Sequence, residues 1–319
     1  MTEPSTPTAA SAPLVILIGA AHVDRIARSH PPYRPQASNP GHLTERVGGA
    51  AFNAAMALQQ FGTAAFLVSV RGGDAGGASV EAALADRGIG DGSLTWLDRA
   101  TPTYTAILDD RGELVAGIAD MALYDLMTPR VLSRKHLRLQ LDAGAALLVD
   151  ANLPAETLLD LAYARRSPVA AIGVSPGKVG RLAAALPRLA MLFVSRLEAA
   201  ALAACEPDAE PRVFVQALTA AGLRRAVITD GPREAWIVED GQIFAQAPPP
   251  VDAVRDVTGA GDTLAAVTLA ECLNRASFRQ AARTGMAAAS LHIAAGLSPG
   301  CAETCRNLGA DLAPLRPIA

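Results

Sequence analysis

The segment that most constrains the fold of this chain is a short glycine-rich turn followed at once by a long, mostly apolar run. Residues 256–262 read D-V-T-G-A-G-D, and residues 263–270 read T-L-A-A-V-T-L-A. The run predicts a helix, which places Gly259, Ala260 and Gly261 at its N-terminus. Unpaired backbone N–H groups and the helix dipole favour an anion there, typically a phosphate, and glycine lets the backbone approach it closely.

Asp262 would stand in the first turn of this helix, beside the predicted phosphate site. A carboxylate repels phosphate, but it can accept the proton of a hydroxyl that attacks phosphorus. With its ordinary pKa of about 3.9, an aspartate is ionised at pH 7. We therefore interpret the segment as a site of phosphoryl transfer to an alcohol, with Asp262 as the general base. The alternative is an ordinary glycine-rich turn capped by an aspartate.

Composition excludes several classes of protein. The net charge of the 319-residue chain is −3 and it has no long basic run, so neither nucleic acid nor an anionic membrane surface is an expected partner. No apolar stretch reaches the roughly 18 residues of a membrane-spanning helix. Residues 1–13 lack the apolar core of a signal peptide and are interpreted as a disordered tail.

The cysteines indicate a cellular compartment rather than a site. Four cysteines in a chain of this length predict a reducing cytoplasm rather than a disulfide framework. Cys301 and Cys305 are spaced to share a helix face, but no further ligands lie near them in sequence. We therefore expect a cytoplasmic protein without a metal site at these residues.

Short apolar runs alternate with helical segments along the chain. Strands are expected at 14–18, 65–70, 145–149, 169–174, 191–194 and 226–229, helices at 49–61, 78–87, 155–165, 179–185 and 197–204, and hairpins at 103–118 and 236–245. This order predicts an α/β fold, with a doubly wound, mostly parallel sheet and helices on both faces, in one domain over residues 14–319. Residues 20–46 and 96–120 do not follow the rhythm and are expected to form a small β lid.

Two glycine motifs together indicate a family. Gly48 and Gly49 precede Asn53 and a run of small residues, and residues 256–262 follow far downstream. In this order the motifs resemble the two signatures of the pfkB (ribokinase-like) carbohydrate kinases. The resemblance extends from about residue 14 to about residue 299, and it implies a kinase that uses ATP and Mg²⁺. It also implies a homodimer formed through the lid, whose edge strands can pair between subunits.

Three further segments resemble the pseudouridine kinases, one group within this family. They are S-N-P-G at 38–41, Y-T-A-I-L-D-D-R-G-E-L at 104–114 with A-D-M at 119–121, and D-A-N-L at 150–153 with V-S-P-G-K at 174–178. Together they imply phosphorylation of the 5′-hydroxyl of a ribosyl nucleoside, with pseudouridine as the best single substrate. A kinase for a free sugar, such as ribose or a keto-sugar acid, and a catalytically weak ligand-binding protein of the same fold remain alternatives.

The resemblance assigns a sugar site to the first part of the chain. Asp24 matches the aspartate of the family's N-x-D segment and would accept hydrogen bonds from a vicinal diol, while His22 stands where the family has Asn. Tyr104 on the lid hairpin would stack on a base. The residues expected to contact substrate are Asp24, Asn39, Gly48, Gly49, Asn53 and Tyr104.

The resemblance assigns the nucleotide site to the second half, where two positions depart from the family. Ser195 replaces the Asn of an N-x-x-E segment, and Glu234 replaces the second glycine of a T-x-G-x-x-G loop, which favours altered nucleotide preference or weak activity. The helical region 282–295 is expected to cover the adenine. The residues expected to contact ATP are Lys178, Ser195, Glu198, Thr229 and Gly231, and Glu198 would also organise Mg²⁺ indirectly.

The start of the glycine segment is also similar to the family's monovalent-cation site. Asp256 and Thr258 resemble positions near that site. Backbone carbonyl groups in this segment could hold potassium. The resemblance therefore implies K⁺ as a further cofactor.

Overall fold

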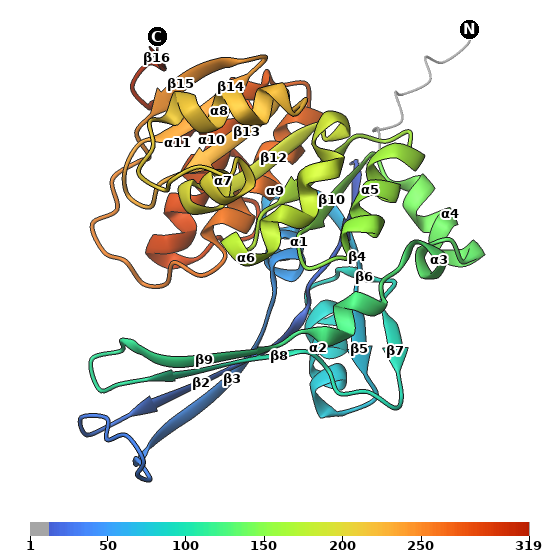
Figure 1. The fold of residues 1–319 in the computed structure, drawn as a ribbon, viewed down its shortest axis with the longest axis vertical. Helices are drawn as coiled ribbons and strands as arrows, with labels where there is room; N and C mark the ends of the chain where they lie inside the picture. The colour runs from blue at the N-terminus through green and yellow to red at the C-terminus, as the bar shows by residue number, and fades with distance from the viewer. Residues whose placement is uncertain (1–12, 319) are drawn as a thin grey trace, which may run out of the picture.

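The computed structural model describes residues 13–318, which form a central sheet flanked by helices and a second, smaller sheet (Figure 1). The central sheet has the strand order β16-β15-β14-β13-β12-β11-β10-β1-β4-β6. Its strands are β1 (Leu14–Ile18), β4 (Ala64–Val68), β6 (Gly90–Asp91), β10 (Ala146–Asp150), β11 (Val169–Ile172), β12 (Met191–Ser195), β13 (Arg225–Thr229), β14 (Ala235–Glu239), β15 (Gln242–Gln246) and β16 (Arg316–Ile318). In this order, neighbouring strands from β13 through β12, β11, β10, β1 and β4 to β6 pair in parallel. The pairs β13–β14, β14–β15 and β15–β16 are antiparallel.

Strand β1 shows how this sheet is buried on both faces. It pairs in parallel with β10 on one side and β4 on the other. Val15 and Leu17 point into one core cluster, Ile16 and Ile18 point into the other, and all four side chains are fully buried. A strand covered on both faces reads as a continuous apolar run, which is why the sequence indicated a parallel strand here.

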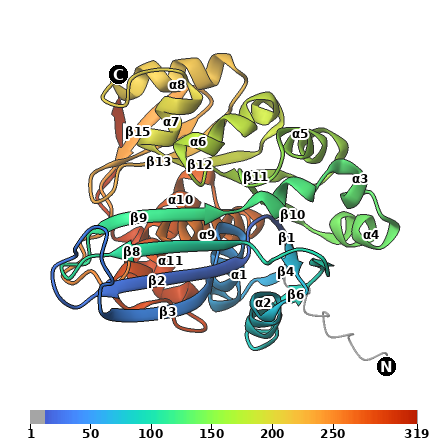
Figure 2. The ribbon, with the colours of Figure 1, turned by 60° about the horizontal axis from the view of Figure 1, so that its bottom comes forward.

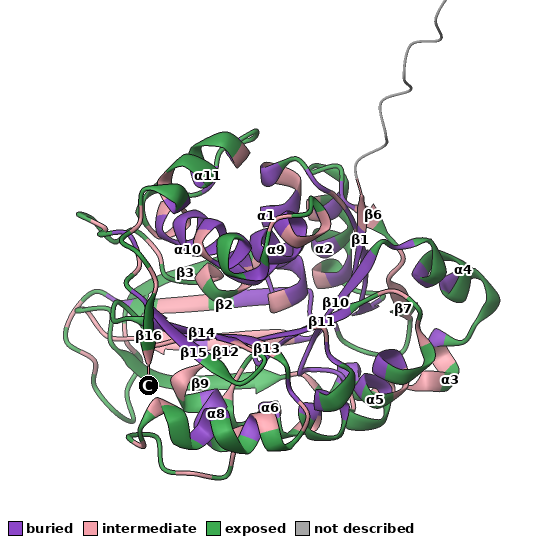
Figure 3. Ribbon diagram, turned by 90° about the horizontal axis from the view of Figure 1, so that it is seen from above, coloured by how far each residue is buried: buried purple, intermediate pink, exposed green. Residues whose placement is uncertain are grey.

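Helices cover both faces of the sheet (Figure 3). One face carries α1 (Ala50–Phe61), α2 (Ala75–Ala85), α9 (Ala260–Leu273), α10 (Phe278–Ala295) and α11 (Ala302–Ala310). The other carries α3 (Pro129–Leu132), α4 (Lys135–Ala143), α5 (Ala155–Ala164), α6 (Pro176–Val179), α7 (Arg196–Leu202), α8 (Pro211–Ala220) and the 3₁₀ helices η1 (Ala122–Leu126) and η2 (Gly180–Arg188). The predicted doubly wound α/β fold is confirmed.

A four-stranded sheet projects from one side of this body (Figures 1 and 2). We call it the outer sheet; its order is β3-β2-β8-β9, with strands β2 (His22–Ser29), β3 (Gly41–Gly48), β8 (Thr103–Leu108) and β9 (Leu114–Asp120). These strands come from the two segments expected to form a lid. Strand β3 ends at Gly48, two residues before α1 begins, so the outer sheet leads directly into the first glycine motif.

Several local expectations were wrong. Helix α2 begins at Ala75 rather than at residue 78, because the Asp74 side chain caps it by accepting a bond from the Gly77 N–H at 2.9 Å. Residues 179–185, expected as an α-helix, lie mostly in the 3₁₀ helix η2, which contains Pro187. Helix α8, strand β16 and the small β5–β7 sheet (Val70–Gly72 and Leu94–Trp96) were not expected. Of the predicted tail, residues 1–12 lie outside the described residues.

Candidate active site

Helix α9 begins as the glycine segment predicts. Its N-cap, Gly259, has φ +80°, a left-handed conformation that glycine adopts without strain. A side chain at this position would also lie 3.2 Å from the amide nitrogen of Asn53, so it would press against that side chain. Asp262 stands in the first turn, and residues 263–271 behind it are buried, which fixes the helix end in place.

The helix end offers backbone donors, although not all that were expected. The Ala260 N–H donates to the carbonyl of Val257 at 3.2 Å. Within the described residues, the N–H groups of Gly259, Gly261 and Asp262 donate to no acceptor. A Cβ added to Gly261 would meet nothing within 4 Å, so open space adjoins this end. Donors beside open space at a helix N-terminus form an anion site.

The two glycine motifs meet at one hydrogen bond. The Asn53 side-chain N–H donates to Oδ2 of Asp262 at 2.9 Å, which links α1 to α9. Gly49 precedes α1 with φ +109°, and a side chain there would lie 2.5 Å from the Ala20 carbonyl oxygen. The turn of the first motif therefore packs against the loop after β1, and Asn53 points toward Asp262, the candidate general base.

The pKa of Asp262 differs from the expected ordinary value. Burial raises it to about 7, the bond from Asn53 opposes the rise, and the nearby carboxylates of Asp150 and Glu198 add to it. Asp262 therefore titrates near neutral pH rather than near pH 4. A general base works best when its pKa lies near the working pH, so the environment of Asp262 suits the predicted role.

A cavity of about 520 Å³, called here the Asp24 cavity, lies between the outer sheet and the glycine segment. It is lined by Asp24, Arg46, Val47, Gly48, Asn53, Met56, Ala83, Arg87, Arg255, Asp256, Thr258, His292, Ala295 and Gly296. The carboxylate of Asp24 is buried, and a side chain at Gly48 would collide with it. Five predicted site residues thus line this cavity. Asp24, Gly48 and Asn53 were expected to contact substrate, and Asp256 and Thr258 were expected to lie near a cation.

His22, which stands where the family has Asn, has defined partners. Its Nε2 lies 3.2 Å from Oδ1 of Asp24, and its Nδ1 lies 3.2 Å from the hydroxyl of Tyr124. Tyr124 is buried, and burial raises its pKa well above the ordinary value, so its hydroxyl keeps its proton and can donate to Nδ1. With Nδ1 accepting from Tyr124, Nε2 is the donor to Asp24, so His22 orients the carboxylate of Asp24.

The remaining predicted substrate residues lie on the outer sheet. Tyr104 pairs with Asp24 in register, so both side chains share one face, and its ring packs over Gly117. Asn39 lies in the loop between β2 and β3, where its amide bonds to the backbone of Arg34 at 2.8 and 2.9 Å and of Ala37 at 3.0 Å. Asn39 therefore holds its own loop and lines none of the cavities described here.

Two further cavities lie at the start of α9. The Met286 cavity, about 670 Å³, is mostly apolar and includes Thr229, Gly231 and the α10 residues Met286, Ala289, Ser290 and Ile293. The smaller Asp262 cavity, about 280 Å³, includes Ser195, Glu198, Gly259, Gly261 and Asp262. The two share Thr229, Gly261 and Leu264, so they adjoin at the start of α9. Helix α10, in the region expected to cover the adenine, lines the apolar Met286 cavity.

The two departures in the nucleotide half of the chain, Ser195 and Glu234, have defined partners in the structure. Ser195 caps α7: its backbone N–H donates to Oε2 of Glu198 at 2.7 Å, and the Glu198 N–H donates to the Ser195 hydroxyl at 3.3 Å. Serine and asparagine are both good N-caps, so this role survives the change. The side chain of Glu234 forms an ion pair with Arg316 on β16 at 2.6 Å. It therefore need not occupy the space that the family's glycine leaves open in this loop.

Lys178, which is half-buried, contacts a pair of buried polar residues, Asp150 and Asn152. Its amine donates to Oδ1 of Asn152 at 2.6 Å, and burial lowers its pKa. Asp150, at the end of β10, is fully buried and accepts bonds from the N–H groups of Ala20 at 2.7 Å and Asn152 at 2.8 Å. Sequence reasoning gave no role to Asp150 or Asn152, although the D-x-N pattern after a parallel strand was a usable signal.

Arg46 and His292 also line the Asp24 cavity and were missed, because neither belongs to a motif. Arg46 lies on β3 and reaches across to the glycine segment, where its Nη1 donates to Oδ2 of Asp256 at 2.7 Å. His292 lies on α10, with Nε2 at 2.7 Å from the carbonyl oxygen of Thr258. Only the folded chain brings these residues together.

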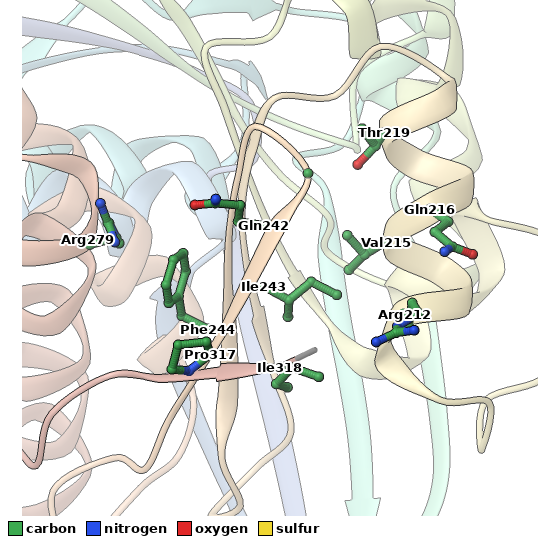
Figure 4. Close-up of a pocket in the computed structure, with 11 residues that line it drawn as sticks. Arg212, Val215, Gln216, Thr219, Gln242, Ile243, Phe244, Arg279, Pro317 and Ile318 are labelled. Carbon is green, nitrogen blue, oxygen red and sulfur yellow. The ribbon is translucent and has the colours of Figure 1, made fainter.

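A separate cavity of about 820 Å³ lies at the far edge of the central sheet, between α8 and strands β15 and β16 (Figure 4). Its lining includes Arg212 and Val215 from α8 and Ile243 from β15. None of the predicted site residues lines it. None of the helices described here combines the length and hydropathy needed to cross a bilayer.

Comparison with known proteins identifies the family. A sequence profile described as pfkB family carbohydrate kinase matches residues 12–305. The pseudouridine kinase of Escherichia coli strain K12 is 29% identical over 262 residues, covering 81% of this chain and 83% of that protein. A solved carbohydrate kinase from Agrobacterium tumefaciens is 36% identical, with a TM-score of 0.84 over 96% of this chain and 100% of that one. Arabidopsis thaliana ribokinase, solved with ribose and ATP, shares the fold, with a TM-score of 0.80 at 19% identity over 93% of this chain and 99% of that one.

The matched residues include both glycine motifs, which the Asn53–Asp262 bond joins in space. The expected family and the ribokinase-like fold are confirmed. The chain belongs to the pfkB family of carbohydrate kinases and is an ATP-dependent kinase.

Proposed function

We propose that this kinase transfers the γ-phosphoryl group of ATP to the 5′-hydroxyl of a ribosyl nucleoside, with pseudouridine as the substrate and pseudouridine 5′-phosphate as the product. The proposed chemistry rests on the position of Asp262. Its carboxylate accepts a hydrogen bond from Asn53, which lines the Asp24 cavity, and Asp262 itself lines the Asp262 cavity. Similarity to a pseudouridine kinase supports the choice of nucleoside. So does Tyr104, an aromatic ring on the face of the outer sheet that carries Asp24.

In the proposed reaction the ribose lies in the Asp24 cavity. Asp24 accepts hydrogen bonds from two ribose hydroxyls, and Gly48 and Gly49 allow close approach of the backbone. The 5′-hydroxyl points to Asp262, which accepts its proton as the oxygen attacks the γ-phosphorus. Asn53 holds the carboxylate in line through their 2.9 Å bond.

Backbone donors then stabilise the charge on the transferring group. We assign this role to the N–H groups of Gly259 and Gly261, which carry no acceptor within the described residues. Ala260 shapes the turn instead, because its N–H is bonded to Val257. Donors fixed in advance at a helix end need no reorganisation during the reaction.

The nucleotide is proposed to span the other two cavities. The adenine fits the apolar Met286 cavity beside Thr229 and Gly231, and the phosphates fit the Asp262 cavity beside Ser195 and Glu198. Among the described residues, no three His, Cys, Asp or Glu side chains gather as a metal site. We therefore propose that Mg²⁺, which neutralises phosphate charge, is held mainly by ATP, with Glu198 acting through water. Lys178 lines neither of these two cavities, and its bond to Asn152 leaves two N–H groups of its amine for a phosphate.

We propose that residues 14–319 form one kinase domain in which the outer sheet acts as a lid. The outer sheet would also form the dimer interface. Leu43 is 61% exposed and Ile118 is 69% exposed. Their register places both on the face opposite to Asp24 and Tyr104. An exposed apolar face on a sheet with a free edge strand is suited to pairing with a second copy. The four free cysteines support the proposed cytoplasmic location.

A second candidate is a kinase for an acidic free sugar, such as a keto-sugar acid. The Asp24 cavity is lined by the side chains of Arg46, Arg87 and Arg255. Arg87 and Arg255 donate to the backbone carbonyls of Ala83 and Ala295 rather than to carboxylates. Their charge is therefore available to a substrate carboxylate.

Release of ADP tests these proposals. We would supply ATP and Mg²⁺ with pseudouridine, uridine, adenosine, ribose or 2-keto-3-deoxygluconate, with Asp262→Ala as the control. We expect turnover with pseudouridine that is lost in the variant. Turnover with 2-keto-3-deoxygluconate or ribose instead would keep the mechanism and overturn the nucleoside assignment. ATP binding without turnover on any of them would favour the catalytically weak binding protein.

A further inference from the structure

One guanidinium group bridges the outer sheet and the catalytic loop. Nη1 of Arg46 on β3 donates to Oδ2 of Asp256 at 2.7 Å, and its Nε lies 3.6 Å from Oδ2 of Asp24. Asp256 opens the segment that leads to Gly259 and the free N–H groups of α9. Arg46, whose side chain is 42% exposed, thus places a positive charge between the carboxylate of Asp24 and the loop that forms the anion site.

The acceptors beside this charge are also engaged. Oδ1 of Asp256 accepts the Thr258 N–H at 2.8 Å, and the Thr258 carbonyl oxygen lies 2.7 Å from Nε2 of His292. At the end of α10, the Ala295 carbonyl accepts a bond from Nη1 of Arg255 at 3.3 Å. Burial alone would raise the pKa of Asp256, but the bonds from Arg46 and Thr258 lower it to about 2.

This arrangement does not fit a resident monovalent cation. A monovalent cation is bound by oxygen atoms directed at it. Where each oxygen already accepts a hydrogen bond, the positively polarised N–H group opposes a cation in the same place. Here Asp256 and Thr258, the residues matched to the family's cation site, present their oxygens to N–H groups of this chain. Potassium was an expected cofactor, and the donors present disagree with it.

We propose that the guanidinium of Arg46 takes the place of a monovalent cation at this loop, so that turnover does not require potassium. The inference rests on the proposed function of residues 256–262 as the phosphoryl-transfer loop. A positive charge bonded to Asp256 holds the loop, and with it the N–H groups of Gly259 and Gly261, as an ion would. Because Arg46 belongs to β3, this charge is supplied by the outer sheet, and the planar guanidinium gives it a fixed direction.

The first test compares the wild-type protein in potassium chloride and in tetramethylammonium chloride at equal ionic strength. Turnover is expected to differ less than twofold between the salts. The thermal midpoint without substrate is expected to agree within about 1 °C, since an ion that binds only the folded protein would raise it. A tenfold activation by potassium, or a midpoint several degrees higher in potassium, would overturn the proposal.

The second test removes the guanidinium. In Arg46→Met, which keeps the length of the side chain, we expect turnover in tetramethylammonium to fall about tenfold and to recover at least threefold in potassium. Its midpoint should rise by about 2 °C in potassium. The matched control is Arg25→Met, which breaks the Arg25–Glu45 pair at 2.8 Å on the other face of the same sheet and should show neither effect.

Loss of turnover in Arg46→Met that is equal in both salts, with no potassium-dependent midpoint, would also overturn the proposal. The thermal comparison needs no substrate. If the nucleoside assignment fails, the salt dependence of the midpoint still decides whether Arg46 replaces the ion.

Discussion

At the scale of single residues, two carboxylates near the start of α9, Asp262 and Asp256, have strongly different environments. Burial raises the pKa of Asp262 to about 7, whereas the bonds from Arg46 and Thr258 lower the pKa of Asp256, which is only partly buried, to about 2. Only the first of these groups changes charge near neutral pH. It can therefore exchange a proton with a substrate hydroxyl while Asp256 stays ionised as an anchor for Arg46.

The raised pKa of Asp262 has a consequence for stability. Between about pH 4 and pH 7 the unfolded chain releases the Asp262 proton, whereas the folded protein keeps it. The free energy of unfolding therefore falls as pH rises through this range. Asp262→Asn should therefore stabilise the ligand-free protein at pH 8, by about 2 kcal/mol after allowing for partial solvent exposure. At pH 4 the two proteins should be nearly equal. Urea denaturation at both pH values measures this, and a difference that grows toward low pH would contradict it.

His22 provides a test of how Asp24 is oriented. His22→Ala removes its contacts with Asp24 and Tyr124, both at 3.2 Å, and should raise KM about tenfold with kcat changed less than threefold, because a hydrogen bond to a charged group is lost. His22→Asn, which can still donate to Asp24, should recover part of the loss. Steady-state kinetics with pseudouridine measures both, and a fall confined to kcat would contradict the positioning role.

At the scale of elements, the glycine motifs are used as helix starts. Both α1 and α9 begin at a glycine with positive φ, and in both a side chain would meet a neighbouring element. These starts could be predicted, because glycine, small residues and apolar periodicity are local signals. Arg46, His292 and Tyr124 could not, since each is positioned by strand pairing or helix packing between segments far apart in sequence. The 3₁₀ helix η2 was missed for a related reason, since local propensity does not separate it from an α-helix.

Helix α7 gives a prediction at this scale. Ser195→Ala removes the hydroxyl that accepts the Glu198 N–H, and should lower the free energy of unfolding by about 1 kcal/mol. Ser195→Asn, which restores the family residue, should lie within a few tenths of a kcal/mol of the wild type. Chemical denaturation of the three proteins measures this. Equal losses in both variants would show that the cap is not the source of the effect.

At the scale of the whole molecule, the outer sheet faces the Asp24 cavity on one side and exposes apolar side chains on the other. Leu43→Glu with Ile118→Glu places charges on that exposed face and should convert the proposed dimer to a monomer at micromolar concentration. Light scattering after size exclusion measures the mass. The control is Leu97→Glu, at a side chain 87% exposed outside the outer sheet, which should remain a dimer. A wild-type monomer would contradict this assignment.

Asp262 lines one cavity and accepts a hydrogen bond from Asn53 of the Asp24 cavity, so its titration is the strongest test of its assignment as the general base. The measurement is kcat/KM for pseudouridine between pH 5.5 and 9 in the wild type, in Asp262→Asn and in Asp311→Asn, an exposed control at the end of α11. In the wild type we predict a tenfold fall per pH unit below about 7 and a plateau above it, shared by the control. Asp262→Asn should be lower by about 10³-fold, without that slope. A profile that is flat through pH 7, or an Asp262→Asn protein within tenfold of the wild type, would contradict the assignment of Asp262 as the general base.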